Sequence, residues 1–150
     1  MEKSIQQLQS IIASYGKQLD SLSENKRIYK PNRAKWSRKE VLGHLIDSAQ
    51  NNIRRFIVAQ YEDKPKIVYA QDNWVAAANY QNYTTNDLVA LWILLNKHIC
   101  MVLKSISKGV EERLCDTGEV HSIKWLAEDY NKHLLYHLHQ VLDMEPVAYP

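Results

Sequence analysis

Apolar residues recur at every third or fourth position along four stretches of the chain, and this spacing constrains the fold more than any other feature. Side chains at that spacing lie on one face of an α-helix, so each stretch predicts a helix with one buried stripe. The predicted helices span about residues 3–22, 37–60, 85–108 and 122–145. The residues expected to be buried are Ile5, Leu8, Ile12, Tyr15, Leu19 and Leu22; Leu42, Leu45, Ile46, Ala49, Ile53 and Phe56; Leu88, Leu91, Leu95, Ile99, Val102 and Ile106; and Ile123, Leu126, Ala127, Tyr130, Leu134 and Val141.

Local start and stop signals agree with these helices. Ser37 and Glu40 form the S-x-x-E pattern of a capping box at the start of the second helix. Pro31 lies in the link before it, and Gly109 is expected to end the third helix. No segment shows apolar and polar residues alternating between hairpin turns, so we expect no β-strands. The sequence therefore predicts an all-α fold, a four-helix bundle in a single domain spanning residues 1–150.

The link from Tyr61 to Thr84 is long for a compact domain. It could run the roughly 30 Å length of a 20-residue helix, so the second and third helices could be parallel neighbours joined by a crossover. Asp72 could cap a short helix within the link. Aromatic residues in this link favour packing over the end of the bundle above a substrate-facing lid. They are Tyr61, Tyr69, Trp74, Tyr80 and Tyr83.

The composition argues against several classes of protein. A net charge of +2 gives little attraction to nucleic acid or membrane, and the apolar run Leu88–Leu95 is far shorter than the roughly 20 residues of a membrane span. Two cysteines, Cys100 and Cys115, are too few for a disulfide framework, and polar residues follow Met1 at once, so we expect a cytoplasmic protein without a signal peptide. Basic residues gather between positions 26 and 39, which we interpret as a solvated link rather than a nucleic-acid patch. They are Lys26, Arg27, Lys30, Arg33, Lys35, Arg38 and Lys39.

Histidines supply the one candidate constellation for chemistry. His133 and His137 stand four positions apart in the fourth helix, so both project from one face, as a metal chelate requires, although such pairs are more often packed or surface residues. His139 points away from the apolar stripe and is expected in solvent. The best third ligand is His44, with His98 and His121 as rivals. By periodicity alone His44 would be a surface histidine, because it falls on a polar stripe with Asp47, Ser48, Asn51 and Arg55.

A family resemblance strengthens this interpretation. The stretch WSRKEVLGHLID from Trp36 to Asp47, together with the NNIRRF that follows from Asn51, resembles the start of a DinB/YfiT-family domain. The stretch WLAEDY from Trp125, continuing through His133-x-x-x-His137-Leu138, is similar to the closing helix of that family. Trp74-Val75 and Leu91-Trp92 with Asn96 also resemble one branch, so the likeness covers nearly the whole chain.

The resemblance implies both a topology and a ligand set. In that family the bundle runs up-down-down-up, and one histidine of the second helix and two of the last bind a divalent metal. Those positions match His44, His133 and His137, while Tyr136 stands where relatives often carry another histidine. At 1.5 Å per residue, His44 lies about 10 Å after its helix begins, and the other two lie about 9 to 15 Å before theirs ends. Antiparallel packing of these two helices would therefore bring all three level.

Three imidazoles leave a coordination position open for water or substrate, as in a catalytic metal site. They suit several divalent transition metals, of which zinc and nickel are favoured here. Asp129 could orient His133, and Asp47 could support His44, although each could equally be an ordinary surface carboxylate. Further residues that could support the ligands or contact substrate are Asn51, Arg55, Trp74 and Tyr136.

The resemblance implies either a metal-dependent hydrolase or a transferase that moves a low-molecular-weight thiol onto an electrophile. We therefore expect a small-molecule substrate, possible thiol dependence and a homodimer, with no nucleic-acid or membrane partner. The alternative is a metal-binding or dimerising bundle without turnover. A polar cavity beside the metal would favour the enzyme, and a metal sealed by side chains would favour the alternative.

Overall fold

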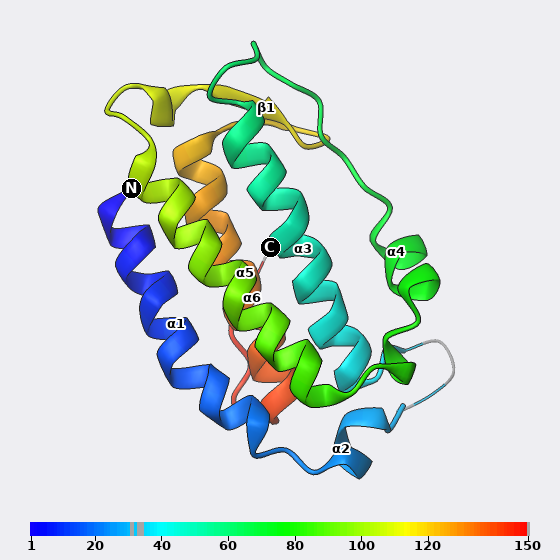
Figure 1. Ribbon diagram of the computed structural model, residues 1–150. Coiled ribbons are helices and arrows are strands. Elements are labelled where there is room, and N and C mark those ends of the chain that lie inside the picture. The colour runs from blue at the N-terminus through cyan, green and yellow to red at the C-terminus, as the bar shows by residue number, and fades with distance from the viewer. Residues whose placement is uncertain (31, 33–34, 150) are drawn as a thin grey trace.

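The computed structural model describes residues 1–30, 32 and 35–149, in which four long helices pack as a bundle (Figure 1). These helices are α1 (Glu2–Asp20), α3 (Arg38–Val58), α5 (Thr85–Ser105) and α6 (Ile123–Leu142). The expected all-α four-helix bundle is thus confirmed, with α1 and α3 each contacting both α5 and α6. The predictions for Pro31 and Arg33 concern positions outside the described residues. The short elements are α2 (Glu24–Ile28), α4 (Gln71–Ala78), η1 (Tyr80–Asn82), η2 (Val110–Glu112), β1 (Leu114–Asp116) and β2 (Val120–Ser122).

The four long helices run up-down-down-up, as the family resemblance implied. In Figure 1 the chain descends through α1, rises through α3, returns down the outside of the bundle and rises again through α5 before α6 descends. The parallel neighbours α3 and α5 are therefore joined by a crossover, residues 59–84, which contains α4 and η1. As a result α3 and α6 pack antiparallel to each other.

Side-chain caps fix where the long helices begin. Ser37 Oγ accepts the Glu40 N–H at 3.1 Å, and the Glu40 carboxylate accepts the Ser37 N–H at 2.7 Å, which confirms the capping box. At α5 and α6 only the first kind of bond is present: the side chains of Thr84 and Ser122 accept the N–H groups of Asp87 and Trp125. The end of α5 was predicted too late, because the helix stops at Ser105 and the chain turns before Gly109.

The crossover contains the predicted short helix, but the prediction that Asp72 caps this helix was wrong. Helix α4 follows Ala70, which provides no side-chain cap, and Asp72 lies inside the first turn, where its negative charge interacts favourably with the helix dipole.

The aromatic residues of the crossover divide between the two roles considered for them. Tyr80 is buried against α3, whereas Trp74 is 40% exposed and Tyr69 lines a cavity described below.

A short antiparallel hairpin, β1 and β2, precedes α6, so the expectation of no strands was wrong. Each strand has only three residues, too few for an alternating pattern to show, and Gly118 adopts a φ of 111° in the turn between them. Cys115 is buried in β1. The crossover bonds to the hairpin through the Ile67 N–H and the Asp116 carbonyl at 2.8 Å, which ties its first half to the segment that precedes α6.

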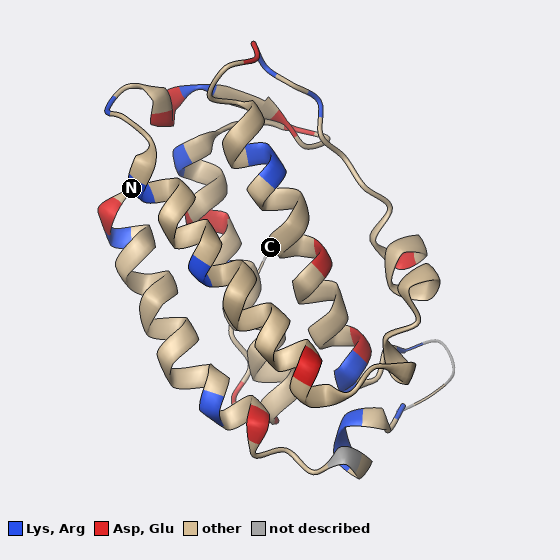
Figure 2. Ribbon diagram, in the orientation of Figure 1, with Lys and Arg blue, Asp and Glu red and all other residues tan. Residues whose placement is uncertain are grey.

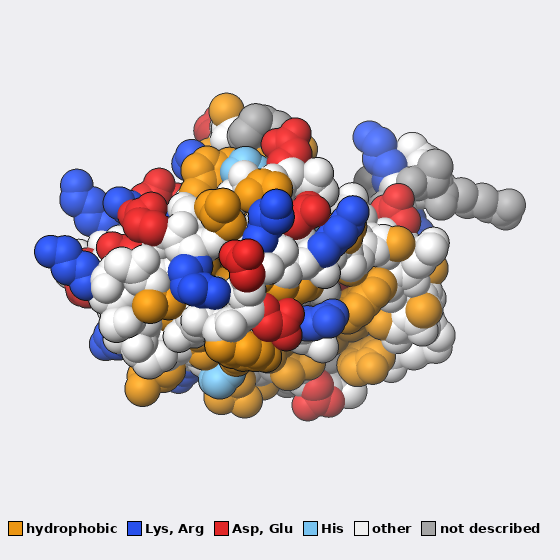
Figure 3. Space-filling model, turned by 90° about the horizontal axis from the view of Figure 1, so that it is seen from above, with side chains coloured by type: hydrophobic (Ala, Val, Ile, Leu, Met, Phe, Trp, Pro, Cys, Tyr) orange, Lys and Arg blue, Asp and Glu red, His pale blue; other side chains and the backbone are white. Residues whose placement is uncertain are grey.

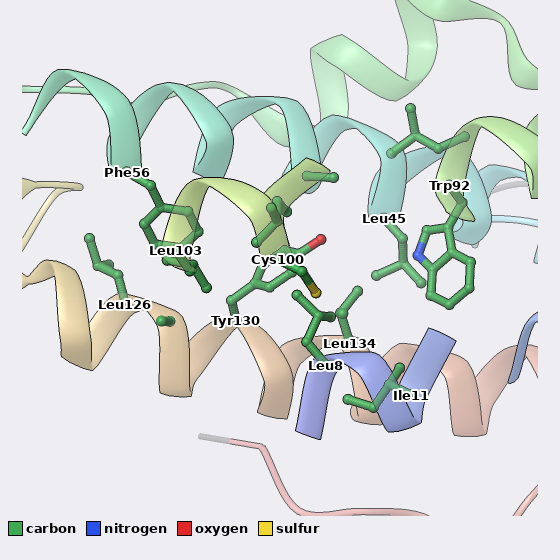
Figure 4. Close-up of a cluster of buried hydrophobic side chains, with 14 of the residues drawn as sticks. Leu8, Ile11, Leu45, Phe56, Trp92, Cys100, Leu103, Leu126, Tyr130 and Leu134 are labelled. Atoms are coloured by element: carbon green, nitrogen blue, oxygen red, sulfur yellow. The ribbon is translucent and has the colours of Figure 1, made fainter. Parts of the chain in front are cut away.

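Buried side chains from all four long helices form one apolar cluster (Figure 4). Two expectations for α5 were wrong: Leu91 is 39% exposed, and Cys100, which lies off the predicted apolar stripe, is buried together with Trp92. The reason is that α5 is covered by both α1 and α3, so its buried arc is wider than a single stripe. One polar pair lies in this core, where the Tyr130 hydroxyl donates to Asn96 Oδ1 at 2.8 Å.

The composition of α5 is apolar enough, and its length sufficient, to cross a membrane. A core helix of a bundle passes the same test, so one such helix is weak evidence. Here the packing of α1 and α3 over Trp92, Ile99 and Leu103 accounts for the apolar residues, although Leu94 and Met101 remain exposed. Charges of both signs are spread over the helices in Figure 2, and the hairpin end has a mixed surface in Figure 3.

The crossover approaches α3 most closely at Gly43. A Cβ at this position would lie 2.0 Å from the Tyr80 ring, which is itself buried and has no free space to move into. We predict that Gly43→Ala lowers the free energy of unfolding by at least about 1 kcal/mol, because overpacking outweighs the gain in helix propensity. Chemical denaturation would measure the change.

Gly16 in α1 offers a matched control, because a Cβ there would meet only the flexible end of Ile93, at 3.2 Å. Gly16→Ala should leave the protein equally stable or stabilise it by up to about 1 kcal/mol. Equal stabilisation by both substitutions would show that Tyr80 does not pack on Gly43 in solution.

Candidate metal centre

His44, His133 and His137 converge where α3 and α6 face each other. His44 lies in the second turn of α3, and the other two lie in the second half of α6, so antiparallel packing brings them level. The Nε2 atoms of His44 and His133 are 3.0 Å apart, and the ligand atoms of all three lie within 4.8 Å of one another. No other group of three potential metal ligands occurs in the described part of the chain. The rival candidates His98 and His121 are not members of this group.

His44 is only 1% exposed, so the surface position inferred from its helical wheel was wrong. The polar stripe of α3 faces α6 and the crossover instead of water, and Asp47, Ser48 and Asn51 are buried along it. A wheel separates polar from apolar faces but does not show what covers each face. The stripe was therefore a signal of a buried polar site.

The three imidazoles are held in their neutral form. Burial lowers the pKa of His44 to about 4, assisted by the neighbouring His137. Burial also lowers the pKa of His133 well below its usual value, with the charges of His137, His44 and Arg55 acting in the same direction. The pKa of His137 is lowered by burial as well, although its hydrogen bond to Gln140 opposes the shift. Neutral imidazoles carry the lone pairs that metal coordination requires.

Hydrogen bonds help to determine which nitrogen of each ring is available. The Nδ1 of His137 lies 2.9 Å from Gln140 Oε1, an acceptor, so Nδ1 carries the proton and Nε2 carries the lone pair. Ser48 Oγ lies 3.5 Å from the Nδ1 of His133. The Nδ1 of His44 is buried without a partner, while its Nε2 faces His133. Each ring thus has an orientation in which Nε2 can point to the others.

This donor set fits a divalent transition metal. Two nitrogens coordinated tetrahedrally at about 2.0–2.1 Å from zinc are separated by about 3.3 Å. The shortest nitrogen separation here is 3.0 Å, and the remaining ones are no longer than 4.8 Å, so small side-chain adjustments would complete the geometry. Three neutral, desolvated histidines whose ligand atoms face one another would gain a favourable partner in a bound cation. These three residues could therefore hold a metal ion.

A cavity of about 510 Å³ opens beside the three histidines. Its wall is mostly polar and is built by α3, the crossover, the hairpin, α6 and the C-terminal tail. The residues that line it are His44, Ser48, Asn52, Arg55, Tyr69, Gln71, Thr117, Gly118, Glu119, His121, Trp125, Leu126, Asp129, Tyr130, His133, His137 and Tyr149. At the rim His121 stacks on Trp125 with ring centroids 3.6 Å apart.

The C-terminal tail supplies part of this wall, which sequence reasoning missed. After α6 the chain reverses at Asp143, which adopts a φ of 53°, and the tail brings Tyr149 back to the site. The Tyr149 ring packs 5.5 Å from that of His133, and its hydroxyl donates to Asp129 Oδ2 at 3.0 Å. A lone tyrosine in a tail carries no periodic pattern, so the sequence offered no signal for it.

His139 anchors this tail, so its expected position in solvent was wrong. Its Nδ1 lies 2.6 Å from the Glu145 carbonyl, which can only accept, so Nδ1 is the donor. Its Nε2 then accepts from the Tyr15 hydroxyl at 2.9 Å in the neutral ring. The residue is partly buried and ties the tail to α1.

The other predicted site residues have different neighbours from those expected. Asp129 bonds Tyr149 and forms no hydrogen bond with His133, while Asp47 accepts from the Tyr80 hydroxyl and keeps one oxygen unpartnered. Asn51 donates within α3, and Trp74 packs on Tyr69 outside the cavity lining. The remaining two candidates, Tyr136 and Arg55, contact the site. Tyr136 packs 4.9 Å from His137, and Arg55 lines the cavity.

Fold and site together define a four-helix bundle with a three-histidine centre. A sequence model of the DinB superfamily matches residues 7–141, so the chain belongs to that superfamily. No curated protein matches the sequence.

Solved structures share the fold at low sequence identity. YfiT from Bacillus subtilis, described as a probable metal-dependent hydrolase with an unusual four-helix bundle topology, superposes with a TM-score of 0.84 at 20% identity over 95% of this chain and 83% of its own. A mycothiol-dependent maleylpyruvate isomerase superposes with a TM-score of 0.77 at 12% identity. The match covers 98% of this chain but only 61% of the isomerase. The DinB-like protein YjoA from Bacillus subtilis superposes with a TM-score of 0.64 at 16% identity, over 98% of this chain and 97% of its own.

The depressed histidine pKa values predict how stability changes with pH in the metal-free protein. Between the ordinary histidine pKa of about 6.5 and the folded value of His44 near 4, the unfolded chain binds more protons than the folded one. We therefore expect the free energy of unfolding to fall as pH is lowered through this window and to be constant just above it. Urea denaturation at a series of pH values would measure it.

Asp47 opposes this trend, because burial raises the pKa of its carboxyl to about 6, despite the hydrogen bond from Tyr80. The folded state thus takes up a proton at Asp47 before the unfolded state does, which adds stability as pH falls. Asp47→Asn should make the loss of stability at low pH steeper. A pH-independent stability would contradict the buried neutral histidines, and a shallower loss in Asp47→Asn would contradict the raised pKa of Asp47.

Proposed function

We propose that this protein is a metal-dependent enzyme that binds one divalent transition-metal ion through His44, His133 and His137 and acts on a small molecule. The observation that carries the proposal is that three neutral imidazoles converge at the wall of a polar cavity of about 510 Å³. A closed structural site would have its remaining position filled by protein. The cavity thus favours an enzyme over a metal-binding or dimerising bundle without turnover. Zinc and nickel are the metals we favour.

For the reaction we favour transfer of a low-molecular-weight thiol to an electrophile. Among the described residues, no carboxylate hydrogen-bonds any of the three histidines, so no general base is held directly against the ligands. When bound, a divalent ion lowers the pKa of a thiol or water in its open position, and a thiol then needs no protein base. The structural likeness to a mycothiol-dependent isomerase supports this choice.

Hydrolysis is the second candidate, and Asp129 is the observation that favours it. This carboxylate lies in the cavity wall, one turn before His133, with one oxygen held by Tyr149. The other oxygen could accept a proton from a water molecule in the cavity. The likeness to YfiT, a probable metal-dependent hydrolase, is consistent with this alternative.

The metal centre makes a stoichiometric prediction. Purified without chelators, the protein should carry about one transition-metal ion per chain, and His133→Ala should weaken binding by more than about 100-fold, the upper range for loss of a residue that only supports a ligand. Elemental analysis and competition with a chromophoric chelator would measure both. His139→Ala is the matched control, which should lose stability with its bond to Tyr15 but keep the metal. Equal metal loss in the two variants would overturn the site.

The thiol reaction makes a spectroscopic prediction. With cobalt in place of the native metal, adding β-mercaptoethanol should produce a sulfur-to-cobalt charge-transfer band in the near ultraviolet, since a soft thiolate suits this ion. Ethylene glycol, which has oxygen in place of sulfur, should produce none. Cys100 and Cys115 are buried away from the cavity lining, so no band is expected before thiol is added. Absence of a band at saturating thiol, with cleavage of ester substrates, would favour hydrolysis.

A further inference from the structure

Arg55 places a cationic group in the wall of the cavity. It lies on α3 eleven residues after His44, about 16 Å further along the helix axis, and shares the cavity-lining face with Ser48 and Asn52. Its guanidinium carbon stands 5.9 Å from the centre of the Tyr69 ring, a cation–π distance. The side chain is partly buried at the end of the cavity nearer the hairpin, where the crossover bonds to β1.

Backbone and amide oxygens hold the guanidinium in one orientation. Its Nε and Nη2 donate to the Ile67 carbonyl at 3.2 and 3.1 Å, and its Nη1 donates to Asn52 Oδ1 at 3.4 Å. A guanidinium has five N–H groups, so these bonds leave one N–H on each terminal nitrogen without an acceptor among the described residues. Two parallel N–H groups at the end of an arginine match the two oxygens of a carboxylate.

The charge of Arg55 is also without a contacting counter-ion. None of the ion pairs in the described ranges includes Arg55, although Asp129 lies close enough to act on it electrostatically. Burial lowers the pKa of this guanidinium, while Tyr69 and Asp129 raise it, and an arginine stays protonated at neutral pH in any case. Desolvating a cation without a partner costs free energy, and a ligand anion in the cavity would recover it.

We propose that Arg55 binds a carboxylate group of the substrate, and so fixes one end of a small carboxylic acid while its reactive end faces the three histidines. This assignment of substrate class rests on the proposed function of the same cavity. A singly charged carboxylate suits the wall better than a phosphate dianion, because two carboxylates, Asp129 and Glu119, already line the cavity with a single guanidinium. Held by Ile67 and Asn52, the guanidinium is oriented before the ligand arrives, which reduces the entropic cost of binding.

The test compares benzoate with benzamide, which has nearly the same shape but no charge. Each is titrated into the metal-free full chain, so that direct coordination to a metal does not contribute, and binding is followed by nitrogen-15 NMR of the Arg55 side chain and the Trp125 indole. We expect benzoate to bind at least about tenfold more tightly than benzamide, since hydrogen bonds to charged groups are worth that ratio or more. Arg55→Gln should remove the preference, and Arg55→Lys should retain part of it, because lysine keeps the charge without the planar pair of donors.

Arg54→Gln is the matched control, because Arg54 is the exposed neighbour of Arg55 on the same helix and does not line the cavity. This variant should retain the full preference for benzoate. His137→Ala should retain it too while losing metal affinity, so a failed metal centre and a failed carboxylate site give different results. Equal binding of benzoate and benzamide, or an unchanged preference in both Arg55 variants, would overturn the proposal. Far-ultraviolet circular dichroism and thermal unfolding of the Arg55 variants establish that they are folded.

Discussion

The antiparallel packing of α3 against α6 is the constraint on which the candidate centre depends. Histidines near the start of one helix and near the end of another meet only if the two helices run in opposite directions at one level. The crossover imposes that direction, because it returns the chain to the bottom of the bundle before α5 begins (Figure 1). Tyr80 then fastens the crossover to α3 through close contact with Gly43 and a hydrogen bond to Asp47, three residues from His44. Topology and site are thus linked by the same few side chains.

The polar face of α3 shows how burial and chemistry depend on each other. Burying a histidine, a carboxyl and part of an arginine along one helix costs solvation free energy that an apolar face would not. The protein reduces this cost by keeping the imidazoles neutral, by bonding Asp47 to Tyr80, and by surrounding Arg55 with carbonyl oxygens. Free hydrogen-bonding groups do remain at the cavity, namely lone pairs on the histidines and two N–H groups of Arg55. A ligand would find its binding energy at these groups.

Periodicity and caps predicted the four long helices closely, since each buries a stripe that the sequence displays, and Ser37 marks a start that the structure retains. The sequence was less informative wherever an element has no period of its own. The three-residue strands show no alternation, the wide buried arc of α5 misplaced Leu91 and Cys100, and the tail that carries Tyr149 has no pattern. The wheel placed His44 at the surface, because helix periodicity separates polar from apolar faces but does not reveal a neighbour that covers the polar one. Two arguments pointed to the centre. One was the family resemblance, and the other was that antiparallel packing of the two helices would bring the three histidines to the same height.

The return of the tail to the cavity has a practical consequence. Tyr149 is the last described residue and packs on His133, so any polypeptide appended beyond it would emerge at the edge of the binding site. A histidine-rich affinity tag fused there would bring additional imidazoles within reach of the centre and compete for its metal. Among the described residues that line the cavity, none belongs to α1. Fusions at Met1 are therefore the safer choice for metal analysis of this protein.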